Sequence, residues 1–340
     1  MPPEWAPHDA TWMAFPTPNA TFEDDSSPAL KAARKAWAAV ANVVVGYEPV
    51  RMLVNQNDRA AAEEVLDPRV RLETIELDDA WLRDAGPTFV HDLSEGVTRA
   101  IAWRFNGWGA QSWASWGRDR HLGARIARAA GVEFDRSNLT QEGGGLHVDG
   151  AGTVLLTETV QLDPDRNPGW LRTEVETEIH QRLGTTTAIW LPRGLTADYD
   201  EFGTRGHVDT VATFAEPGTV LVHTQPDSGH PDHEPMKEVG EILRTAVDAR
   251  GQRLRVVDLP SPTVADFDGR PVDHSYVNHY VANGVVVGCA FDDPQDAVAA
   301  DVLTRAYPGR DVVLIDARDI FRFGGGVHCI TQQQPAAPWS

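Results

Sequence analysis

The chain has 340 residues, 41% of them hydrophobic, and a formal net charge of −20 at pH 7. This is the composition of a globular protein with one large domain or two ordinary ones, and the acidic excess argues against binding of DNA or another polyanion. No apolar run reaches the roughly 18 residues of a membrane span, no secretory signal is recognisable, and two cysteines give no disulfide framework, so we expect a cytoplasmic protein.

The predicted elements begin with a strand at residues 10–15 and a helix at 28–45, and then fall into a coarse repeat. Each unit, roughly 60–70 residues long, reads as an apolar strand, a polar or glycine-rich cluster, a hairpin and an amphipathic helix. The opening strands are expected at 70–77, 132–134, 188–191, 254–258 and 312–315. The hairpins are expected at 88–105 and around turns at 149–152, 216–218 and 283–284. The helices are expected at 117–130, 170–183, 238–250 and 295–306.

The fifth unit ends before its helix, and the strand and helix at the N-terminus supply the missing part. We therefore expect the two ends of the chain to meet and to close one ring over residues 1–340. In such a ring the polar clusters point to one axis, so positions distant in sequence form one site. The alternative is an ordinary α/β sheet in which the clusters are separate loops at strand ends.

The polar clusters contain five candidate catalytic residues: Asp84, Glu142, His207, Asp209 and Cys329. His207 and Asp209 are two positions apart on an expected strand, so their side chains would share a face. Each candidate also has a structural reading, such as an ion pair for Asp84 with Arg83 or an inert buried thiol for Cys329. Cys289 lies in an apolar strand, and for it we expect the core role.

These side chains together predict chemistry on a planar cation. Guanidinium presents a fork of N–H groups that matches carboxylate oxygens. A thiolate can attack its central carbon, and a histidine can protonate the departing amine and then activate water. The set therefore indicates hydrolysis of a guanidino or amidino group without a metal.

Five separate strings, in order and spread over almost the whole chain, resemble the agmatine deiminase family of the guanidino-group-modifying superfamily. That superfamily has the pentein fold, a five-bladed pseudo-symmetric α/β propeller, and it includes the porphyromonas-type peptidylarginine deiminases. The N-terminal residues 3–16 are also similar to the start of that family. The strings are 81–87 (Trp-Leu-Arg-Asp-Ala-Gly-Pro), 105–109 (Phe-Asn-Gly-Trp-Gly), 142–150 (Glu-Gly-Gly-Gly-Leu-His-Val-Asp-Gly), 205–209 (Arg-Gly-His-Val-Asp) and 324–333 (Gly-Gly-Gly-Val-His-Cys-Ile-Thr-Gln-Gln).

The resemblance implies a role for each candidate. Cys329 would be the nucleophile that forms an amidino-thioether, and His207 the general acid and base. Asp84 and Asp209 would hold the guanidinium, and Glu142 would bond to it or orient His207. Trp81 would line the channel. Agmatine would become N-carbamoylputrescine and ammonia, with no cofactor and with a small cationic guanidino compound as the partner.

The sequence departs from the family pattern in three places. The segment before Cys329 is one residue shorter than the expected Gly-Gly-Gly-Asn-Ile-His-Cys, Arg205 stands where asparagine is frequent, and the stretch 195–204 is longer than usual. An arginine near the channel would favour a carboxylate-tailed guanidine. The reading we prefer is that Arg205 pairs with Asp198, Asp200 or Glu201.

Several alternatives stay open at this point. The same constellation serves deiminases of arginine, peptidyl-arginine or a guanidino acid, and amidinotransferases. A metallohydrolase would use His230, His233 and Glu234 with the His207 and Asp209 pair, although the segment 227–235 reads as an exposed loop. A binding module without catalysis is a further alternative. The tryptophans at 103, 108, 113 and 116 suit a homo-oligomer interface, the channel wall or the core.

Overall fold

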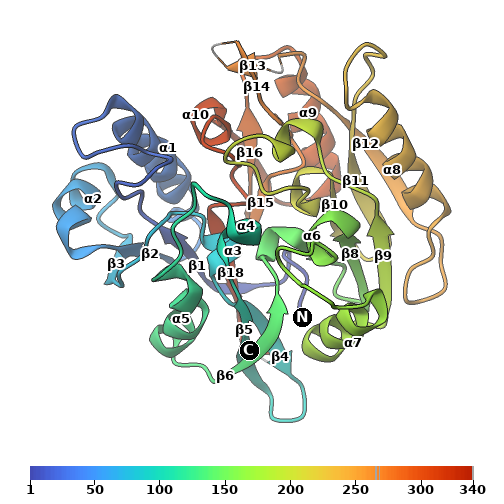
Figure 1. Cartoon of the computed structure of the whole chain (residues 1–340), viewed down its shortest axis with the longest axis horizontal. Coiled ribbons are helices and arrows are strands. Elements are labelled where there is room, and N and C mark those ends of the chain that lie inside the picture. The colour runs from blue at the N-terminus through green and yellow to red at the C-terminus, as the bar shows by residue number, and fades with distance from the viewer. Residues whose placement is uncertain (265, 268, 339–340) are drawn as a thin grey trace.

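The computed structural model describes residues 1–264, 266–267 and 269–338, and this part of the chain has a mixed α/β fold (Figure 1). Its strands form five sheets of three or four strands and one two-stranded ribbon. In each of the five, a pair of antiparallel strands is followed by a parallel strand that the chain reaches through a helix. The order of elements expected from the repeat is therefore confirmed.

The strands of these sheets are short, as expected for units of this size. The first sheet contains β18 (Thr331–Pro335), β1 (His8–Ala14), β2 (Val50–Val54) and β3 (Arg71–Thr74). The second and third contain β4 (Thr88–Asp92), β5 (Val97–Arg104) and β6 (Phe134–Thr140), then β7 (Leu146–Val148), β8 (Thr153–Thr157) and β9 (Thr187–Leu191). The fourth and fifth contain β10 (Ala212–Glu216), β11 (Thr219–Thr224) and β12 (Arg255–Pro260), then β15 (Tyr280–Ala282), β16 (Val285–Ala290) and β17 (Asp311–Asp316). The ribbon is β13 (Asp266–Phe267) with β14 (Arg270–Pro271).

Six helices cover the outer faces of the sheets, and Figure 1 shows them around the periphery. Helix α1 shows why they form: the Ser27 hydroxyl accepts from Leu30 N–H at its start, Pro28 needs no donor there, and its apolar face is buried. The six are α1 (Pro28–Val44), α2 (Arg59–Val65), α5 (Leu122–Ala130), α7 (Arg172–Leu183), α8 (His233–Thr245) and α9 (Gln295–Ala306). None of the helices in the described part of the chain is long and apolar enough to cross a membrane.

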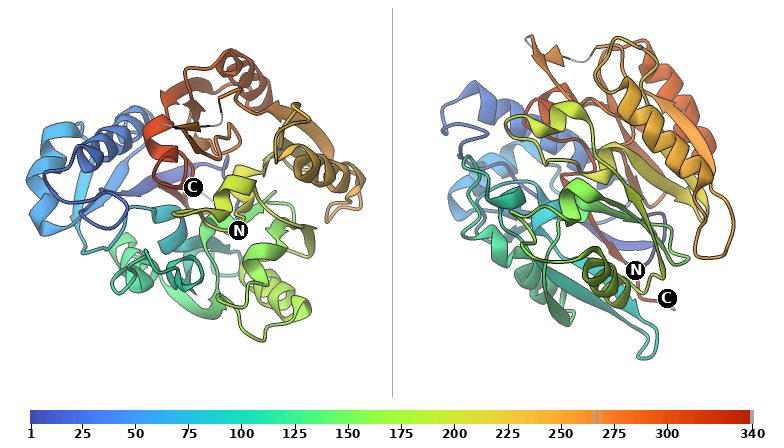
Figure 2. Two further views of the ribbon diagram at one scale, coloured as in Figure 1. Left: turned by 45° about the horizontal axis from the view of Figure 1, so that its top comes forward. Right: turned by 45° about the vertical axis from the view of Figure 1, so that its right-hand side comes forward.

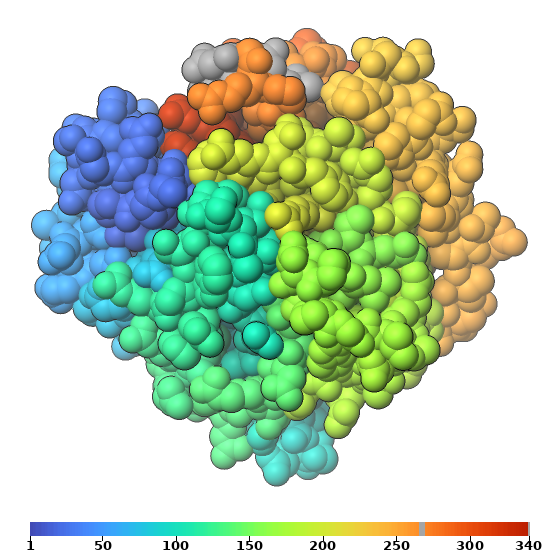
Figure 3. Space-filling model, in the orientation of Figure 1, coloured from blue at the N-terminus to red at the C-terminus, as the bar shows by residue number. Residues whose placement is uncertain are grey.

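The two ends of the chain share one sheet. Strand β1 pairs antiparallel with β18, with Thr11 opposite Gln333, and parallel with β2. In the left view of Figure 2 both termini lie near the middle of the molecule, and in both views they lie close to each other. In Figure 3 successive stretches of the chain occupy neighbouring sectors of the surface. The prediction that the ends meet is thus confirmed.

Short turns and helices connect the sheets on the side where the polar clusters lie. They are α3 (Leu82–Ala85), α4 (Gly107–Ala110), α6 (Glu158–Gln161) and α10 (Arg318–Phe321), with single 3₁₀ turns such as Gly143–Gly145 and Val208–Thr210. The last of these corrects a prediction, because His207 and Asp209 do not lie on a strand. Their side chains share a site through a tight turn instead of through the alternation of a strand.

Other boundaries also differ from the predictions. Helix α8 begins at His233 and ends at Thr245, whereas we expected 238–250. Pro235 is tolerated because it falls in the first turn, where its missing N–H has no intrahelical partner. Strand β6 extends to Thr140 and not only over 132–134. Strand β2 and helix α2 were not predicted, so the first sheet has one strand more than the repeat suggested.

Candidate active site

The five candidate residues come from four connecting segments between the sheets, and three of them surround one glycine. A Cβ atom on Gly144 would lie 2.5 Å from His207 Nδ1, 2.9 Å from Asp209 Oδ2 and 3.0 Å from Asp84 Oδ1. Cys329 Sγ is 3.6 Å from Asp209 Oδ2. All these side chains are buried. Only a residue without a side chain fits between them, which explains the glycine at this position.

Asp84 is held from two sides at the start of α3. Its Oδ1 accepts from the Gly144 N–H at 3.0 Å, and its Oδ2 accepts from Trp108 Nε1 at 2.9 Å. Burial, with the nearby charges of Asp209 and Glu142, raises the pKa of Asp84 although His207 opposes the shift. The carboxylate is therefore fixed in position and short of positive charge, as a site for a cation requires.

His207 lies between two carboxylates. Its Nε2 is 3.5 Å from Glu142 Oε2, and its Nδ1 is 3.7 Å from Asp84 Oδ1. Burial disfavours the charged ring, but Asp84, Glu142 and Asp209 together outweigh burial and raise the pKa of His207 to about 9. The ring is therefore an imidazolium at neutral pH and can donate a proton.

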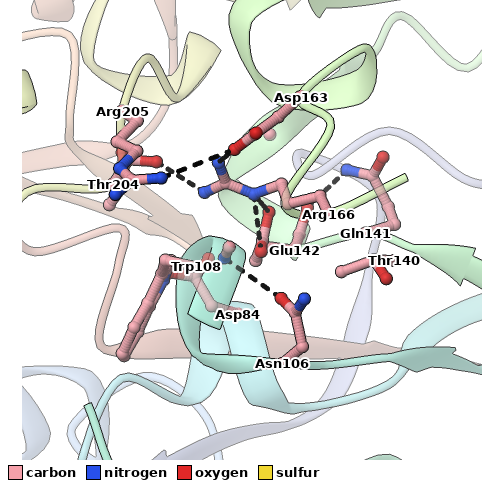
Figure 4. A network of polar contacts seen from close by, with 12 residues as sticks. Asp84, Asn106, Trp108, Thr140, Gln141, Glu142, Asp163, Arg166, Thr204 and Arg205 are labelled. Carbon is pink, nitrogen blue, oxygen red and sulfur yellow. Dashed lines mark hydrogen bonds and ion pairs between the residues drawn. The ribbon is translucent and has the colours of Figure 1, made fainter. Parts of the chain in front are cut away.

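Glu142 is fixed by a buried arginine, as Figure 4 shows. Arg166 Nε lies 3.0 Å from Oε1 and 3.1 Å from Oε2 of Glu142, and its Nη1 donates to Asp163 at 2.8 Å. Burial works against the Glu142 anion, but Arg166 and His207 lower the pKa of Glu142 to about 2. The Glu142 carboxylate is thus a permanent charge that orients His207.

Asp209 is held by the histidine next to the nucleophile. Its Oδ2 lies 2.7 Å from His328 Nδ1, while Oδ1 is buried without a hydrogen-bond partner among the described residues. The contacts with His328 lower the pKa of Asp209 despite its burial. An ionised oxygen without a donor can accept from a guanidinium N–H.

The Cys329 thiol is 3% exposed and lies beside Asn278, whose Nδ2 is 3.2 Å from Sγ. Burial, with Asp209 and Asp84 nearby, raises the pKa of Cys329 well above that of a free thiol. The resting side chain is therefore a neutral thiol. By contrast Cys289 lies in β16 within the core, where burial raises its pKa to about 12, and the core role expected for it is confirmed.

Trp81 lies one glycine away from the nucleophile. A Cβ on Gly325 would be 2.7 Å from the Trp81 ring and 3.2 Å from Cys329 Sγ. The other side of the indole packs against Trp37, with ring centroids 5.1 Å apart. Trp81 therefore lies close to the thiol, and its role in lining a channel stays a prediction.

Sequence reasoning missed four side chains of this site. Trp108 was considered only with the other tryptophans, as interface, channel wall or core, and Asn278 was given no role. Glu4, which contacts His328, stood in the N-terminal string and was also given no role. Arg166 gave no signal, because the Asp-Pro-Asp-Arg-Asn stretch around it reads as an exposed loop. Its burial follows only from the position of α6 over the site.

The partners expected for Arg205 are wrong. Its Nη1 lies 3.2 Å from Asp165 and 3.9 Å from Asp163. The Asp198 carboxylate accepts instead from the N–H groups of Thr204 and Gly206, so it holds the turn before His207 in place. Arg205 therefore joins the loop before the Val208–Thr210 turn to the loop after α6, and its charge is already paired.

A cavity of about 550 Å³ opens beside the glycine run that precedes Cys329. Its lining is rich in acidic side chains, and Gly324 and Phe202 belong to its wall. The acidic members are Glu23, Asp198, Asp200, Glu201 and Asp273, and they outnumber the basic members Arg270 and Arg322. This lining favours a positively charged molecule.

The residues suggested for a metal do not come together. Among the described residues, the group of His, Cys, Asp and Glu side chains close enough to share an ion is Glu4, His147 and His328, without His230 or His233. His147 Nδ1 accepts from Phe214 N–H, and its Nε2 lies 2.8 Å from the Thr213 hydroxyl. Both ring nitrogens of His147 are engaged, so this group does not offer three free ligands.

The tryptophan-rich stretch belongs to the interior. Trp103 and Trp108 are buried, and Trp113 and Trp116 are half-buried against the main core. Trp108 stacks on Trp113 with ring centroids 5.2 Å apart. These side chains form part of the core and of the wall around Asp84.

Known proteins match this chain over nearly its full length. Residues 1–335 match a family model described as Porphyromonas-type peptidyl-arginine deiminase. A putative agmatine deiminase of Streptomyces coelicolor is 58% identical over 336 residues, which are 98% of each chain. An agmatine deiminase of Stutzerimonas stutzeri is 37% identical over 99% of this chain and 95% of that protein. The structure of an agmatine deiminase of Enterococcus faecalis superposes with a TM-score of 0.92 at 29% identity, over 99% of this chain and 96% of that one.

Proposed function

Because the chain belongs to the Porphyromonas-type peptidyl-arginine deiminase family, we propose that Cys329 carries out the hydrolysis of agmatine to N-carbamoylputrescine and ammonia. One observation carries the assignment of the site. Asp84, His207 and Asp209 surround Gly144 within a few ångströms, and the Cys329 thiol is 3.6 Å from Asp209. Two carboxylates, a proton donor and a nucleophile then face the same small space.

Substrate binding supplies the charge that the nucleophile lacks. The buried carboxylates Asp84 and Asp209 raise the pKa of Cys329, and a guanidinium between them would offset their charge. The buried carboxylates Glu4, Asp84, Glu142 and Asp209 each lie within ion-pair distance of Arg83, Arg166, His207 or His328. The guanidinium adds one positive charge beside the thiol, so its binding lowers the pKa of Cys329 and favours the thiolate. The thiol proton leaves to solvent as the cation binds.

The covalent steps then follow from the positions of the side chains. The thiolate adds to the guanidinium carbon, and the His207 imidazolium gives its proton to one amino group, which departs as ammonia. An amidino-thioether on Cys329 remains. Neutral His207 takes a proton from water as the water oxygen adds to the same carbon. The C–S bond breaks while the hydroxyl of this intermediate gives its proton to solvent, and the neutral ureido product leaves. The thiolate takes up a proton from solvent when the site empties. The carboxylates of Asp84 and Asp209 oppose proton loss from the guanidinium throughout.

The tail of the substrate is assigned on charge. Arg205 pairs with the side chains of Asp163 and Asp165, so Arg205 does not offer a free cation to a substrate carboxylate. The cavity beside Gly324 has acidic lining that suits the primary amine of agmatine. This favours agmatine over arginine or a guanidino acid. The buried thiol, 3% exposed, also disfavours peptidyl-arginine.

We further propose that the five sheets are the blades of one closed α/β propeller, in a single domain over residues 1–340. The pairing of β1 with β18 supports closure by the two ends of the chain. We propose that the enzyme works in the cytoplasm, since both cysteines are free thiols. We propose that it needs no metal or other cofactor, because the side chains of the site supply the nucleophile, the acid and the charge.

The test uses agmatine with the wild-type protein and two cysteine variants. Wild type should release ammonia, and mass measurement of the Cys329 peptide after an acid quench should show the added amidine. Cys329→Ser should lose both turnover and adduct, whereas Cys289→Ser should keep them. Faster turnover of arginine or of a peptidyl-arginine substrate than of agmatine would show that agmatine is not the preferred substrate. Full turnover by Cys329→Ser would overturn the mechanism.

A further inference from the structure

The side chain of Glu4 lies under the active site, although it belongs to the N-terminal segment that precedes β1. It is 4% exposed. Its Oε2 lies 2.8 Å from His328 Nε2 and 3.2 Å from Arg83 Nη2, and its Oε1 accepts from the Val281 N–H at 2.8 Å. One carboxylate thus joins three distant segments, and two of them carry the neighbours of Asp84 and Cys329.

His328 lies between two carboxylates. Its Nδ1 is 2.7 Å from Asp209 Oδ2, and its Nε2 is 2.8 Å from Glu4 Oε2. An ionised carboxylate can only accept hydrogen bonds, so both ring nitrogens must carry protons. The geometry therefore requires an imidazolium at His328.

We propose that Glu4 is a positioning residue: it keeps His328 as an imidazolium, and that imidazolium fixes Asp209 beside the Cys329 thiol and the substrate guanidinium. This inference rests on the proposed function of Asp209 as a ligand of the guanidinium. Glu4 does not touch the reacting atoms. It acts through His328 as a donor that holds one oxygen of Asp209 and leaves the other free for substrate.

Other charged and titratable groups also face this chain of contacts. Arg83 opposes the charge of His328, and Glu4 and Asp209 favour it, so that the pKa of His328 is raised despite burial. The His147 ring lies 6.1 Å from the His328 ring and is neutral, since burial lowers its pKa to about 3. His279 is a further neutral neighbour, because burial lowers its pKa to about 4. With Cys329, these groups surround the His328 ring, and none except Glu4 and Asp209 accepts its protons.

Glu4→Gln tests the inference because it keeps the shape and removes the charge. Its amide would still accept from Val281 through one oxygen, but it would present N–H groups to His328 Nε2 and Arg83. His328 should then lose the Nε2 proton at lower pH, by about one pKa unit or more. NMR titration of the labelled His328 ring measures this shift without any substrate. We also expect kcat/KM for agmatine to fall about tenfold, mostly as a higher KM.

The pH dependence separates this role from a merely structural one. The ratio of variant to wild-type kcat/KM should fall as pH rises, since His328 becomes neutral earlier in Glu4→Gln. Glu4→Asp, which restores the charge, should recover part of the loss. If Glu4→Gln does not fold, Glu4→Asp carries the same test with a smaller shift of the His328 midpoint, caused by the shorter side chain.

Glu48→Gln is the matched control. Glu48 is also a buried glutamate beside a histidine of the N-terminal segment, with its Oε1 3.2 Å from His8 Nδ1, and His8 Nε2 lies 2.7 Å from the Glu4 carbonyl oxygen. This change disturbs the same segment but leaves the Glu4 carboxylate and His328 in place. Its kcat/KM ratio to wild type should not vary with pH. An unshifted His328 midpoint in Glu4→Gln, or the same flat ratio as in the control, would overturn the inference. Failure of wild type to turn over agmatine would instead refute the proposed function.

Discussion

Nδ1 of His207 lies 3.7 Å from Oδ1 of Asp84, and the backbone of Gly144 passes close to both atoms. The proposed proton donor and one proposed ligand of the cation are thus neighbours although they belong to connecting segments more than 100 residues apart in the chain. His207 is protonated because Asp84, Glu142 and Asp209 surround it. The size of the space they share is set by the absence of a side chain at Gly144.

Gly144→Ala should strongly reduce activity and leave the fold largely intact. The added Cβ would lie 2.5 Å from His207 Nδ1, closer than atoms can approach without displacement of the ring. We expect kcat/KM to fall by about 100-fold or more, since small displacements of reacting groups have costs of that order. Steady-state kinetics and thermal unfolding measure the two effects. In the control Gly117→Ala, the new Cβ would approach only Asp78 Oδ2, at 3.8 Å, and kinetics should be unchanged.

Asp84→Asn should separate the reactivity of the thiol from turnover. Loss of the Asp84 charge lowers the pKa of Cys329, which Asp84 helps to raise, so alkylation by iodoacetamide at pH 8 should be faster. Turnover of agmatine should instead fall about 100-fold, because a buried partner of the guanidinium is lost. A Cys289→Ser background leaves one thiol to follow. Parallel slowing of alkylation and turnover would contradict the charge argument.

The charge on His207 should make stability depend on pH in a defined window. Its pKa is raised from an ordinary value near 6.5 to about 9, so its favourable contribution is fully present below pH 6.5 and is lost as pH rises towards 9. The loss is on the order of 3 kcal/mol. The difference in unfolding free energy between wild type and His207→Gln, measured in urea at several pH values, isolates this contribution. A difference that is constant from pH 6 to pH 9.5 would show that folding does not raise the pKa of His207.

Arg166→Met should destabilise the protein as well as inactivate it. It leaves the Glu142 carboxylate buried without its cation, at a cost of about 3–5 kcal/mol for a broken buried pair. His207 also loses a properly oriented partner, so kcat should fall. Urea unfolding and steady-state kinetics measure both effects. Arg172→Met removes an ion pair with Glu158 that is nearly half exposed, and it should change stability by only about 0–1 kcal/mol.

The repeat of elements was readable from sequence because hydrophobic periodicity and turn residues are local. Helix α9 occupies the predicted residues 295–306, and the hairpins turn at the predicted positions around 149–152, 216–218 and 283–284. Strand β2 was not predicted, because it is a segment of only five residues between two helices. The predicted start of α8 was wrong because a proline in the first turn of a helix is also typical of a loop.

The contacts of the candidate residues were decided by tertiary structure. The sequence could place Asp84, Glu142, His207, Asp209 and Cys329 in polar clusters, but the side chains that tune them come from elsewhere. Arg166 reaches Glu142 from the loop after α6, and Arg205 turns to Asp165 instead of to the acids of its own loop. Such choices depend on which loops face one another across the site, and no local pattern contains that information.

The sequence by itself determined which chemical groups are available and the order of strands and helices, because composition, spacing and periodicity are properties of the chain alone. Only the tertiary structure decided their charge states. Burial keeps Cys329 a neutral thiol, and neighbouring carboxylates stabilise the protonated form of His207. Glu4 and Asp209 stabilise His328 as a cation. The physical reason is that a pKa depends on desolvation and on charges a few ångströms away, and folding brings those charges together from distant positions.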